Sequence, residues 1–394
     1  MSRRLDPTLP ARLREMGLMD NSKCFNCGHC TAVCQLTEEG FAYPRQDIRM
    51  LQMGLGDALT ERVEPWLCYY CGDCTKSCPR DANPAEQMMA LRRYLTAAYD
   101  WTGLAWKFYT SKAWEIGVLL GLALIVVGLF VVPHLLHPGQ IQWEPLDGGV
   151  AVSSFAAVSW VHLGDMVMLG LLSFLLLSNI FRMGRRILGA ARVPIPITLY
   201  LSEAWHLVTH FATQRRFGKC NDKEAYWVVH LMLMSGYAIM FLLVIVFLSS
   251  LQTDVGLNWT TLPGYFATFA LLYASAYFLR GRWQKSAEVN RYSTFSDWLF
   301  PALLFATSLT GILMHIFRYY LTWPAGTYVM YVIHMAIVVP MLMVEVPFSK
   351  WSHLAYRPFA IYFANIRSKA LQAAQKTQPG SLGVPPAVSN ALEV

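Results

Sequence analysis

The residues most able to carry chemistry are eight cysteines that form two runs of identical spacing. In each run three cysteines are separated by two residues, and a fourth follows after three more. Three cysteines at this spacing wrap one face of a cubane [4Fe–4S] cluster, and the fourth reaches the other cluster. The sequence therefore predicts two [4Fe–4S] clusters, one held by Cys24, Cys27, Cys30 and Cys78 and the other by Cys68, Cys71, Cys74 and Cys34. A pair of zinc sites is the alternative, but zinc usually takes two CxxC pairs rather than this duplicated register.

Five histidines lie within or beside long apolar stretches, where an ionisable side chain is costly and usually functional. They are His162, His230, His315, His334 and His353. His230 and His353 fall near one membrane face, and the other three lie toward the opposite face. Two such layers predict b-type haem, with two bis-histidine haems stacked across the bilayer, because neutral imidazole is a preferred iron ligand. The alternative for any single histidine is an interfacial residue hydrogen-bonded to a neighbouring helix.

Two further ionisable residues accompany the histidines near the outer face. Arg318 lies one turn beyond His315, where it could pair with a haem propionate or extend toward the interface. Asp165 follows His162 by three residues on the same helix face, so it could orient that imidazole or serve as a proton site for a quinone. The sequence leaves these alternatives open.

The composition indicates that a membrane domain must position these groups. Hydrophobic residues make up 55% of the 394 residues and charged residues only 14%, against roughly 45–50% and about 25% in ordinary soluble domains. A lipid bilayer is the place to bury this apolar excess. The net charge of +7 does not indicate nucleic-acid binding, because the basic residues cluster beside the apolar stretches, as a topology signal would.

An all-α architecture is expected, with a helical two-cluster ferredoxin domain followed by a six-helix transmembrane bundle of the cytochrome b kind. Each apolar stretch is near the roughly 20 residues that cross a bilayer. The predicted spans are 114–136, 158–181, 226–250, 262–280, 297–320 and 327–347. The cluster domain is predicted over 1–100, the membrane domain over 101–369 and a disordered tail over 370–394, which is rich in Gln, Ser, Gly and Pro.

The charge of the links predicts the orientation. Links 137–157, 252–261 and 319–326 contain no Lys or Arg, whereas link 182–225 contains eight. By the positive-inside rule the basic links and both termini face the cytoplasm. No signal peptide is visible at the N-terminus, and cysteines of this kind belong in a reducing compartment. We therefore expect a multi-pass protein of the cytoplasmic membrane with its cluster domain inside the cell.

Link 182–225 contains a second helical pattern. Apolar residues recur at helical spacing from 197 to 217, and the segment ends in basic residues. This pattern is typical of an amphipathic helix on the cytoplasmic membrane surface. A helix packed on the cluster domain is the equal alternative.

The chain resembles known families over roughly residues 20–365. The cysteine domain is similar to the small iron–sulfur subunit of heterodisulfide reductase. The membrane part resembles the cytochrome b subunit of that enzyme and, more distantly, the gamma subunit of respiratory nitrate reductase. A chain that joins both parts resembles the C subunits of quinone-interacting membrane-bound oxidoreductase complexes. In the membrane part the resemblance rests on His230, residues 311–318, His334 and residues 347–353.

The resemblance implies a ligand set and partners. It implies an inner haem held by His230 and His353, and an outer haem held by His334 with His315 or His162. A bend at Pro347 would bring His334 and His353 to compatible faces. The resemblance also implies menaquinone as the quinone, FAD- and iron–sulfur-containing cytoplasmic partners similar to the A subunit of heterodisulfide reductase, and adenylyl-sulfate reductase as the eventual redox partner.

The expected function is a subunit that passes electrons between membrane quinone and soluble partners through haem and two clusters. No Gly-rich dinucleotide motif and no nucleophile constellation is visible, so other substrate chemistry belongs to partner subunits. Two alternatives stand beside this reading. One is a non-catalytic membrane anchor for a soluble iron–sulfur reductase, and the other is a different quinone oxidoreductase of the heterodisulfide reductase type.

Overall fold

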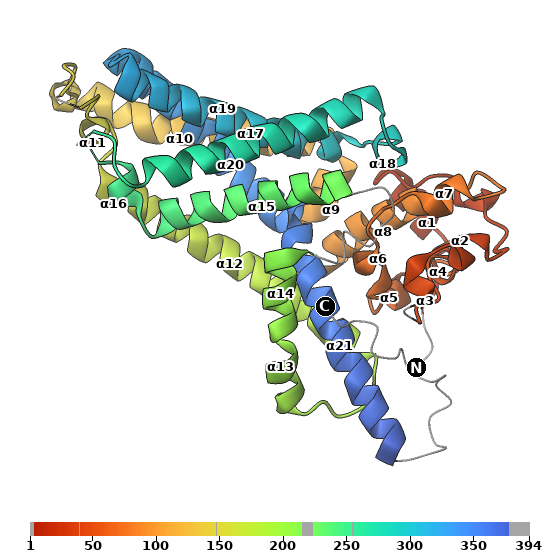
Figure 1. Cartoon of the computed structure of the whole chain (residues 1–394). Coiled ribbons are helices and arrows are strands. Elements are labelled where there is room, and N and C mark those ends of the chain that lie inside the picture. Colours follow the sequence, from red (N-terminus) through yellow and green to blue (C-terminus); the bar gives the residue numbers. More distant parts are fainter. Residues whose placement is uncertain (1–3, 39, 147, 215–223, 254–255, 378–394) are drawn as a thin grey trace.

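The computed structural model describes residues 4–38, 40–146, 148–214, 224–253 and 256–377. Within these ranges every regular element is helical, and the one strand-like feature is a single bridge between Leu146 and Gly149. A unit of short helices lies at one end of a bundle of long helices (Figure 1). The predicted all-α fold with six long apolar helices is confirmed.

The N-terminal unit consists of short helices around one long one. The short helices are α1 (Leu9–Arg14), η1 (Asn21–Lys23), α2 (His29–Ala32), α3 (Gln35–Glu38), α4 (Arg45–Gln52), α5 (Gly56–Leu59), α6 (Glu64–Leu67) and α7 (Asp73–Lys76). The long helix is α8 (Pro84–Tyr99), which begins with a proline where the missing N–H is tolerated. Its residues Met88, Leu91 and Leu95 are buried in one core with Trp66 and Leu67.

Within the described residues, six helices are long and apolar enough to cross a membrane. They are α10 (Lys112–Leu136), α12 (Val158–Gly189), α15 (Glu224–Ile245), α17 (Thr261–Gln284), α19 (Phe295–His315) with its π-helical continuation η4 (Ile316–Tyr320), and α20 (Pro324–Phe348). Shorter connecting helices are α9 (Leu104–Thr110), η2 (Pro138–Gln140), α11 (Val152–Phe155), α16 (Leu248–Leu251) and α18 (Glu288–Arg291). Each long helix overlaps one of the predicted spans.

Helix α12 differs most from its prediction, because it runs past residue 181 to Gly189. Its 32 residues correspond to about 48 Å of helix, more than the roughly 30 Å of a hydrocarbon core. The basic residues that ended the apolar pattern instead extend the helix onto the N-terminal unit. Arg182 Nε donates to the carbonyl of Tyr99 at 2.8 Å, and Arg186 donates to the hydroxyl of Thr60 at 2.8 Å.

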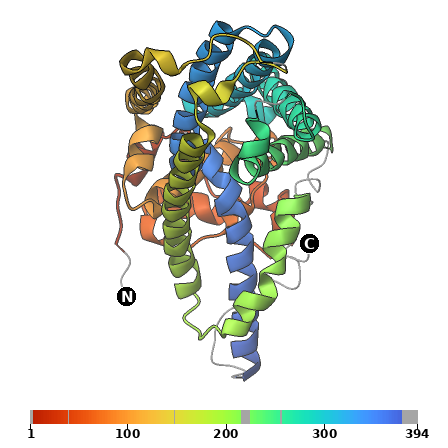
Figure 2. The same cartoon turned by 90° about the vertical axis from the view of Figure 1, so that its left-hand side faces the viewer.

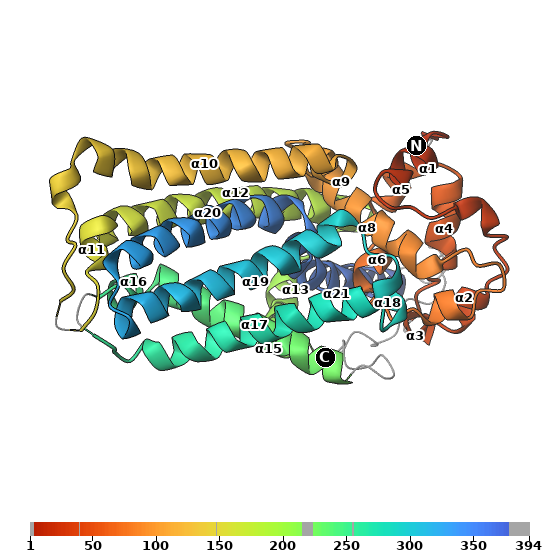
Figure 3. The same ribbon diagram turned by 90° about the horizontal axis from the view of Figure 1, so that it is seen from above.

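The long helices pack in a row in which chain neighbours are mostly spatial neighbours. Helix α15 packs on α17, α17 on α19, α19 on α20, and α20 on α10 (Figure 3). Gly236 of α15 allows the close approach of α17, since a Cβ there would lie 3.0 Å from the carbonyl oxygen of Ala267. Small residues at such contacts are the usual means of packing helices in a membrane.

The chain changes direction after α20 and then forms a further long helix. Helix α20 continues through Pro347 to Phe348, and the break comes at Ser349, followed by η5 (Lys350–Ser352) and α21 (His353–Thr377). The bend expected at Pro347 therefore lies two residues later. The tail predicted from residue 370 is also wrong at its start, because α21 continues as helix to Thr377. Residues 378–394 lie outside the described residues.

Helix α21 joins the two parts of the molecule. Its residues Tyr356, Ile361 and Ala364 share one hydrophobic core with Trp66 of the N-terminal unit and Met183 of α12. Helix α21 and the C-terminal end of α12 thus pack directly on the unit that contains the cysteines. The predicted domain boundary near residue 100 stays a prediction.

Link 182–225 folds as two helices in its described part, α13 (Ile197–Glu203) and α14 (Trp205–Thr213). Both pack against α21, with Glu203 and Lys369 joined at 2.7 Å (Figure 2). A single helix over 197–217 was predicted, and residues 215–223 lie outside the described part. The face of these helices that contains Glu203 packs on α21, and their predicted place on the membrane surface stays a prediction.

Candidate functional site

The two cysteine runs adopt the same local backbone. The third residue of each run, Asn26 or Tyr70, has φ of 58°, and the fifth, Gly28 or Gly72, has φ of 90° or 89°. The glycines then cap the one-turn helices α2 and α7. A positive φ at the fifth position favours glycine, because it has no Cβ. The duplicated spacing is therefore a duplicated conformation, in which each run presents its sulfurs from the same type of turn.

The neighbours of individual cysteines follow the predicted exchange of fourth ligands. Cys30 interacts electrostatically with the other two members of its triplet and with Cys78 of the second run. Cys34 interacts most strongly with Cys68 and then with Cys71. Each fourth cysteine is thus close to the triplet of the other run, although the assignment of ligands stays a prediction.

The cysteine donors fit iron–sulfur clusters. Burial raises the pKa of the Cys34 thiol to about 12, so coordination to a metal is the means by which this sulfur would lose its proton. Among the described residues no three Cys, His, Asp or Glu side chains converge as tightly as a single metal ion requires. A cubane takes each cysteine on a different iron, so its ligands lie further apart.

The two runs differ in their surroundings. In the first run Cys27 is exposed and the neighbouring Phe25 is 69% exposed, with the Arg80 guanidinium above its ring. In the second run Cys68 is buried in the hydrophobic core that includes α12 and α21. The first run therefore faces the surroundings of the molecule, and the second faces the helical bundle.

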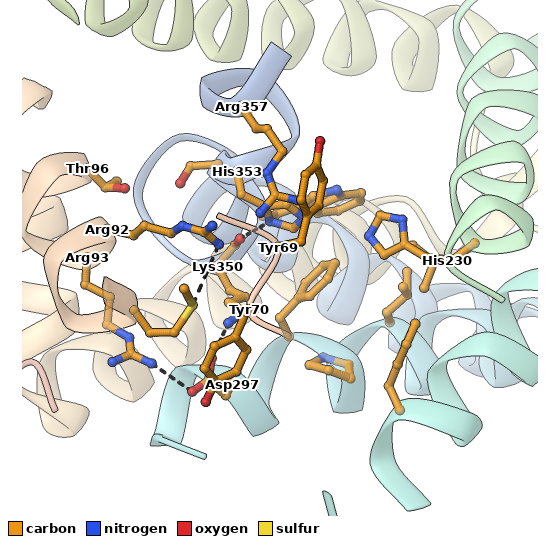
Figure 4. A pocket seen from close by; sticks show the side chains of 18 of the residues that line it. Tyr69, Tyr70, Arg92, Arg93, Thr96, His230, Asp297, Lys350, His353 and Arg357 are labelled. Carbon is orange, nitrogen blue, oxygen red and sulfur yellow. Dashed lines mark hydrogen bonds and ion pairs between the residues drawn. The ribbon is translucent and has the colours of Figure 1, made fainter. Parts of the chain in front are cut away.

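A cavity of about 170 Å³ lies between the second cysteine run and the bundle (Figure 4). It is lined by Tyr69 and Tyr70, which stand between Cys68 and Cys71, and by two of the predicted histidines, His230 and His353. Five basic side chains, called the cationic wall below, and one acidic side chain also line the cavity. The basic residues are Arg92, Arg93, Arg282, Lys350 and Arg357, and the acidic residue is Asp297.

His230 of α15 and His353 of α21 face each other across 6.3 Å between ring centroids. A metal–imidazole bond is about 2 Å and the ring centre lies about 1 Å further, so two rings on opposite sides of one iron have centroids roughly 6 Å apart. The two rings therefore fit a bis-histidine haem. The surrounding cations fit the anionic propionates of such a group.

Both imidazoles are held through Nδ1. His230 Nδ1 lies 2.6 Å from Oε1 of Gln214, and His353 Nδ1 lies 2.6 Å from the carbonyl oxygen of Lys350. A hydrogen bond at one ring nitrogen sets the tautomer and leaves the other nitrogen for a metal. Burial, together with the nearby Arg357, holds the pKa of His353 well below its usual range. This imidazole is consequently neutral, as an iron ligand must be.

The outer histidines are not brought together in the same way. His334 Nδ1 lies 3.0 Å from Thr310 Oγ1, and its ring lies against Gly311. His315 points toward α17, where its Nε2 lies 2.8 Å from the hydroxyl of Tyr265. His162 is exposed on α12. In the described part of the chain no ring contact joins His334 to another histidine, so the outer haem and its ligand pair stay predictions.

Arg318 is engaged with the protein backbone. It is 5% exposed and donates to the carbonyl oxygens of Val150 and Thr253. These contacts tie the links beside α11 and α16 to the end of α19. Its predicted pairing with a haem propionate stays a prediction, whereas extension to the interface does not describe this buried side chain.

A buried ion network fastens the N-terminal unit to the bundle beside the same cavity. Arg93 of α8 lies 2.9 Å from Asp297 of α19, and Lys350 also pairs with Asp297. Behind it Glu115, which is fully buried, accepts from Ser349 at 3.1 Å. The sequence had pointed to Asp165 but not to Glu115, because Glu115 stands in the first turn of its span, where charges are common.

Several residues around the histidines were missed by sequence reasoning. Gln214 and Thr310 support imidazoles, but an uncharged residue distant in sequence has no spacing signal. Arg357 follows His353 by four residues, and that spacing places both on one helix face. For the missed residues, this spacing of Arg357 from His353 was the one signal in the sequence.

Comparisons with known proteins agree with the cysteine geometry. Residues 20–82 match the family model of the 4Fe-4S dicluster domain. The chain is 37% identical over 94 residues to a protein of Archaeoglobus profundus that is similar to the C subunit of heterodisulfide reductase, covering 24% of this chain and 50% of that protein. It is 33% identical over 153 residues to the iron–sulfur C subunit of the CoB–CoM heterodisulfide reductase of Methanopyrus kandleri, covering 36% and 79%. It thus spans half the length of the first relative and most of the second. No solved structure matches the chain.

Proposed function

Because the chain belongs to the family of iron–sulfur C subunits of heterodisulfide reductase, we propose that it is the membrane subunit through which a redox complex exchanges electrons with quinone. An iron–sulfur electron-transfer role follows from the matched dicluster domain and the relatives in that family. The quinone, the haem and the identity of the complex are the proposed parts. We also propose that the joined architecture is that of the C subunit of a quinone-interacting membrane-bound oxidoreductase complex.

The observation that carries the proposal is one cavity lined from both sides. Tyr69 and Tyr70 of the second cysteine run and the facing rings of His230 and His353 line it together. His230 and His353 would hold b-type haem, and the cysteines would hold the two clusters. When bound, these groups supply one-electron transfer between the membrane and the cytoplasm. The second run would adjoin the haem, and the first run, with Cys27 exposed, would serve the soluble partner.

The chain's own residues determine what this arrangement can do. His230 and His353 are oriented by their Nδ1 partners. Trp351 and Phe300, whose rings lie 4.9 Å apart, line the cavity and exclude water. Electrostatic contacts are stronger where the surroundings are less polar. The positive charges of the cationic wall would therefore stabilise added negative charge on both the haem and the adjacent cluster.

The resemblance extends the proposal to partners. It supports menaquinone as the quinone, FAD- and iron–sulfur-containing cytoplasmic subunits as direct partners, and adenylyl-sulfate reductase as the final redox partner. It also supports a cytoplasmic membrane location with both termini inside the cell. A non-catalytic anchor is the alternative, and the shared core of α12, α21 and the N-terminal unit would suit it. It leaves the facing histidines without a role.

The test is an optical spectrum of the purified full chain with iron and haem quantified, for wild type and for H230A and H353A. We expect a b-type spectrum, and we expect both variants to lose the same component while they keep their clusters. Each variant removes one of the two imidazoles that would hold the group. H334A should remove a different component if a second haem is present.

His137, which is exposed near the end of α10, provides the matched control. H137A should leave the spectrum unchanged. A wild-type spectrum without haem, in a preparation that retains its clusters, would leave the anchor as the better function. A single haem that survives both H230A and H353A would refute the assigned pair.

A further inference from the structure

Two arginines from different parts of the molecule converge on one backbone oxygen of the second cysteine run. Arg357 of α21 donates to the carbonyl of Cys68 at 2.8 Å, and Arg92 of α8 donates to the same oxygen. Each has a further backbone contact nearby, since Arg357 Nε donates to the carbonyl of Trp66 and Arg92 Nε to that of Pro65. Both guanidinium groups are thus fixed beside a predicted cluster ligand.

These two cations have no acidic partner within the described part of the chain. The ion pairs found there engage other arginines, such as Arg62 with Asp47 and Arg93 with Asp297. Both side chains are half-buried, and two like charges held together away from bulk water are stabilised by a nearby anion. A [4Fe–4S] cluster with four thiolate ligands is an anion at that position.

Arg357 also faces the histidine cavity. It stands one turn after His353 on α21, and its guanidinium lies 4.9 Å from the centre of the Tyr69 ring. Figure 4 shows His353, Arg357 and Tyr69 together between the bundle and the cysteine loop. The first turn of α21 therefore places a histidine toward one predicted cofactor and a cation toward the other.

We propose that Arg92 and Arg357 are positioning residues that raise the reduction potential of the cluster held by the second cysteine run, an inference that rests on the proposed function. A reduced cluster carries one more negative charge than an oxidised one. Fixed positive charge beside it stabilises the reduced form, and hydrogen bonds to ligand groups act in the same direction. The effect would make this cluster a good acceptor for an electron that leaves the membrane side.

The test is a redox titration followed by electron paramagnetic resonance on the full chain, purified in detergent with its cofactors. In R357Q and in R92Q we expect one cluster to become harder to reduce, with about a tenfold smaller ratio of reduced to oxidised cluster at a fixed potential. For a one-electron couple that ratio corresponds to ~59 mV. The other cluster should keep its potential. R357K retains the charge, so its shift should be smaller than that of R357Q.

Arg186 of α12 is the matched control, because it is also a half-buried arginine that reaches the N-terminal unit but donates to the hydroxyl of Thr60, away from the second cysteine run and the cavity. R186Q should loosen the contact of α12 with the N-terminal unit without moving either potential. Unchanged potentials in R357Q and R92Q, or an equal shift in R186Q, would overturn the inference. If R357Q loses the cluster, R357K decides: a potential near wild type supports the role of charge, and a loss as large as that of R357Q refutes it. A wild-type chain without two cluster signals would refute the proposed function itself.

Discussion

Three half-buried imidazoles each have an oxygen at Nδ1, but the three oxygens differ in kind. His230 uses the amide of Gln214, His334 the hydroxyl of Thr310, and His353 a backbone carbonyl. Only the first two can be removed by substitution of a side chain. The backbone carbonyl depends instead on the turn after α20, so the orientation of His353 is a property of the chain path there.

The cysteines allow a sharp prediction at the same scale. C34S should disrupt the cluster held by the second triplet, because Cys34 interacts first with Cys68 and Cys71 rather than with its own triplet. Roughly half of the cluster iron should be lost, since each cubane depends on all four ligands. Iron analysis combined with electron paramagnetic resonance measures this outcome.

The reciprocal variant serves as the control. C78S should affect the cluster of the first triplet, because Cys78 interacts with Cys30. The two variants should therefore remove different resonance signals. Loss of the first triplet's signal in C34S would show that each run holds its own cluster.

At the scale of elements, the break between α20 and α21 decides the site. A continuous helix would place His334 and His353, nineteen positions apart, about 100° apart around one axis. The break at Ser349, with φ of −124° and ψ of −148°, ends this constraint and lets His353 begin a new helix. The new helix then carries His353 to His230 and Arg357 to Cys68.

Helices α13 and α14 present an apolar row on the side away from α21. The residues of this row are Ile197, Leu201, Trp205 and Val208, which are between 55% and 74% exposed. Figure 1 shows the pair running across the direction of the long helices, at the end of the bundle nearest the N-terminal unit. We therefore expect this row to lie in the membrane surface, as in other interfacial amphipathic helices.

Trp205 can report on that location in reconstituted vesicles. The fluorescence of the chain in brominated lipid should include a quenched component that is absent from W205F, because only the Trp205 ring would be removed from the lipid. W66F is a matched control, since Trp66 is 1% exposed in the protein core. Equal quenching of wild type and W205F would place the row outside the lipid.

At the scale of the whole molecule, the N-terminal unit and α21 lie at the same end of the bundle, and α11 and α16 lie at the other (Figures 1 and 3). The links without basic residues belong to the far end, and the basic links belong to the end with the cysteines. By the positive-inside rule we expect the cysteine end to be cytoplasmic. The fold and the charge pattern thus agree on one orientation.

Reporter fusions check this topology directly. Fusions at Gly148, Thr253 and Ala325 should report the outside, and fusions at Gly189, Lys285 and Ser368 the cytoplasm. The physical reason is the cost of moving clustered Lys and Arg residues across the membrane during insertion. A paired reporter that is active only in the opposite compartment provides the control, and one reversed site would contradict the six-span arrangement.

The sequence by itself determined the features that depend on local patterns. Cysteine spacing predicted the dicluster domain, and runs of about 20 apolar residues predicted six spans, because ligand wrapping and bilayer thickness both act over a few turns of chain. The ends of the spans do not follow from such patterns. Helix α12 continues past its basic residues because the N-terminal unit supplies partners for Arg182 and Arg186.

The tertiary structure alone decided which distant residues meet. Five histidines looked alike in their apolar surroundings, yet only His230 and His353 face each other among the described residues. The convergence of Arg92 and Arg357 on Cys68 joins helices that are hundreds of residues apart in the chain. Such contacts follow from helix packing and from the break at Ser349, and these are set by the whole core rather than by any local spacing.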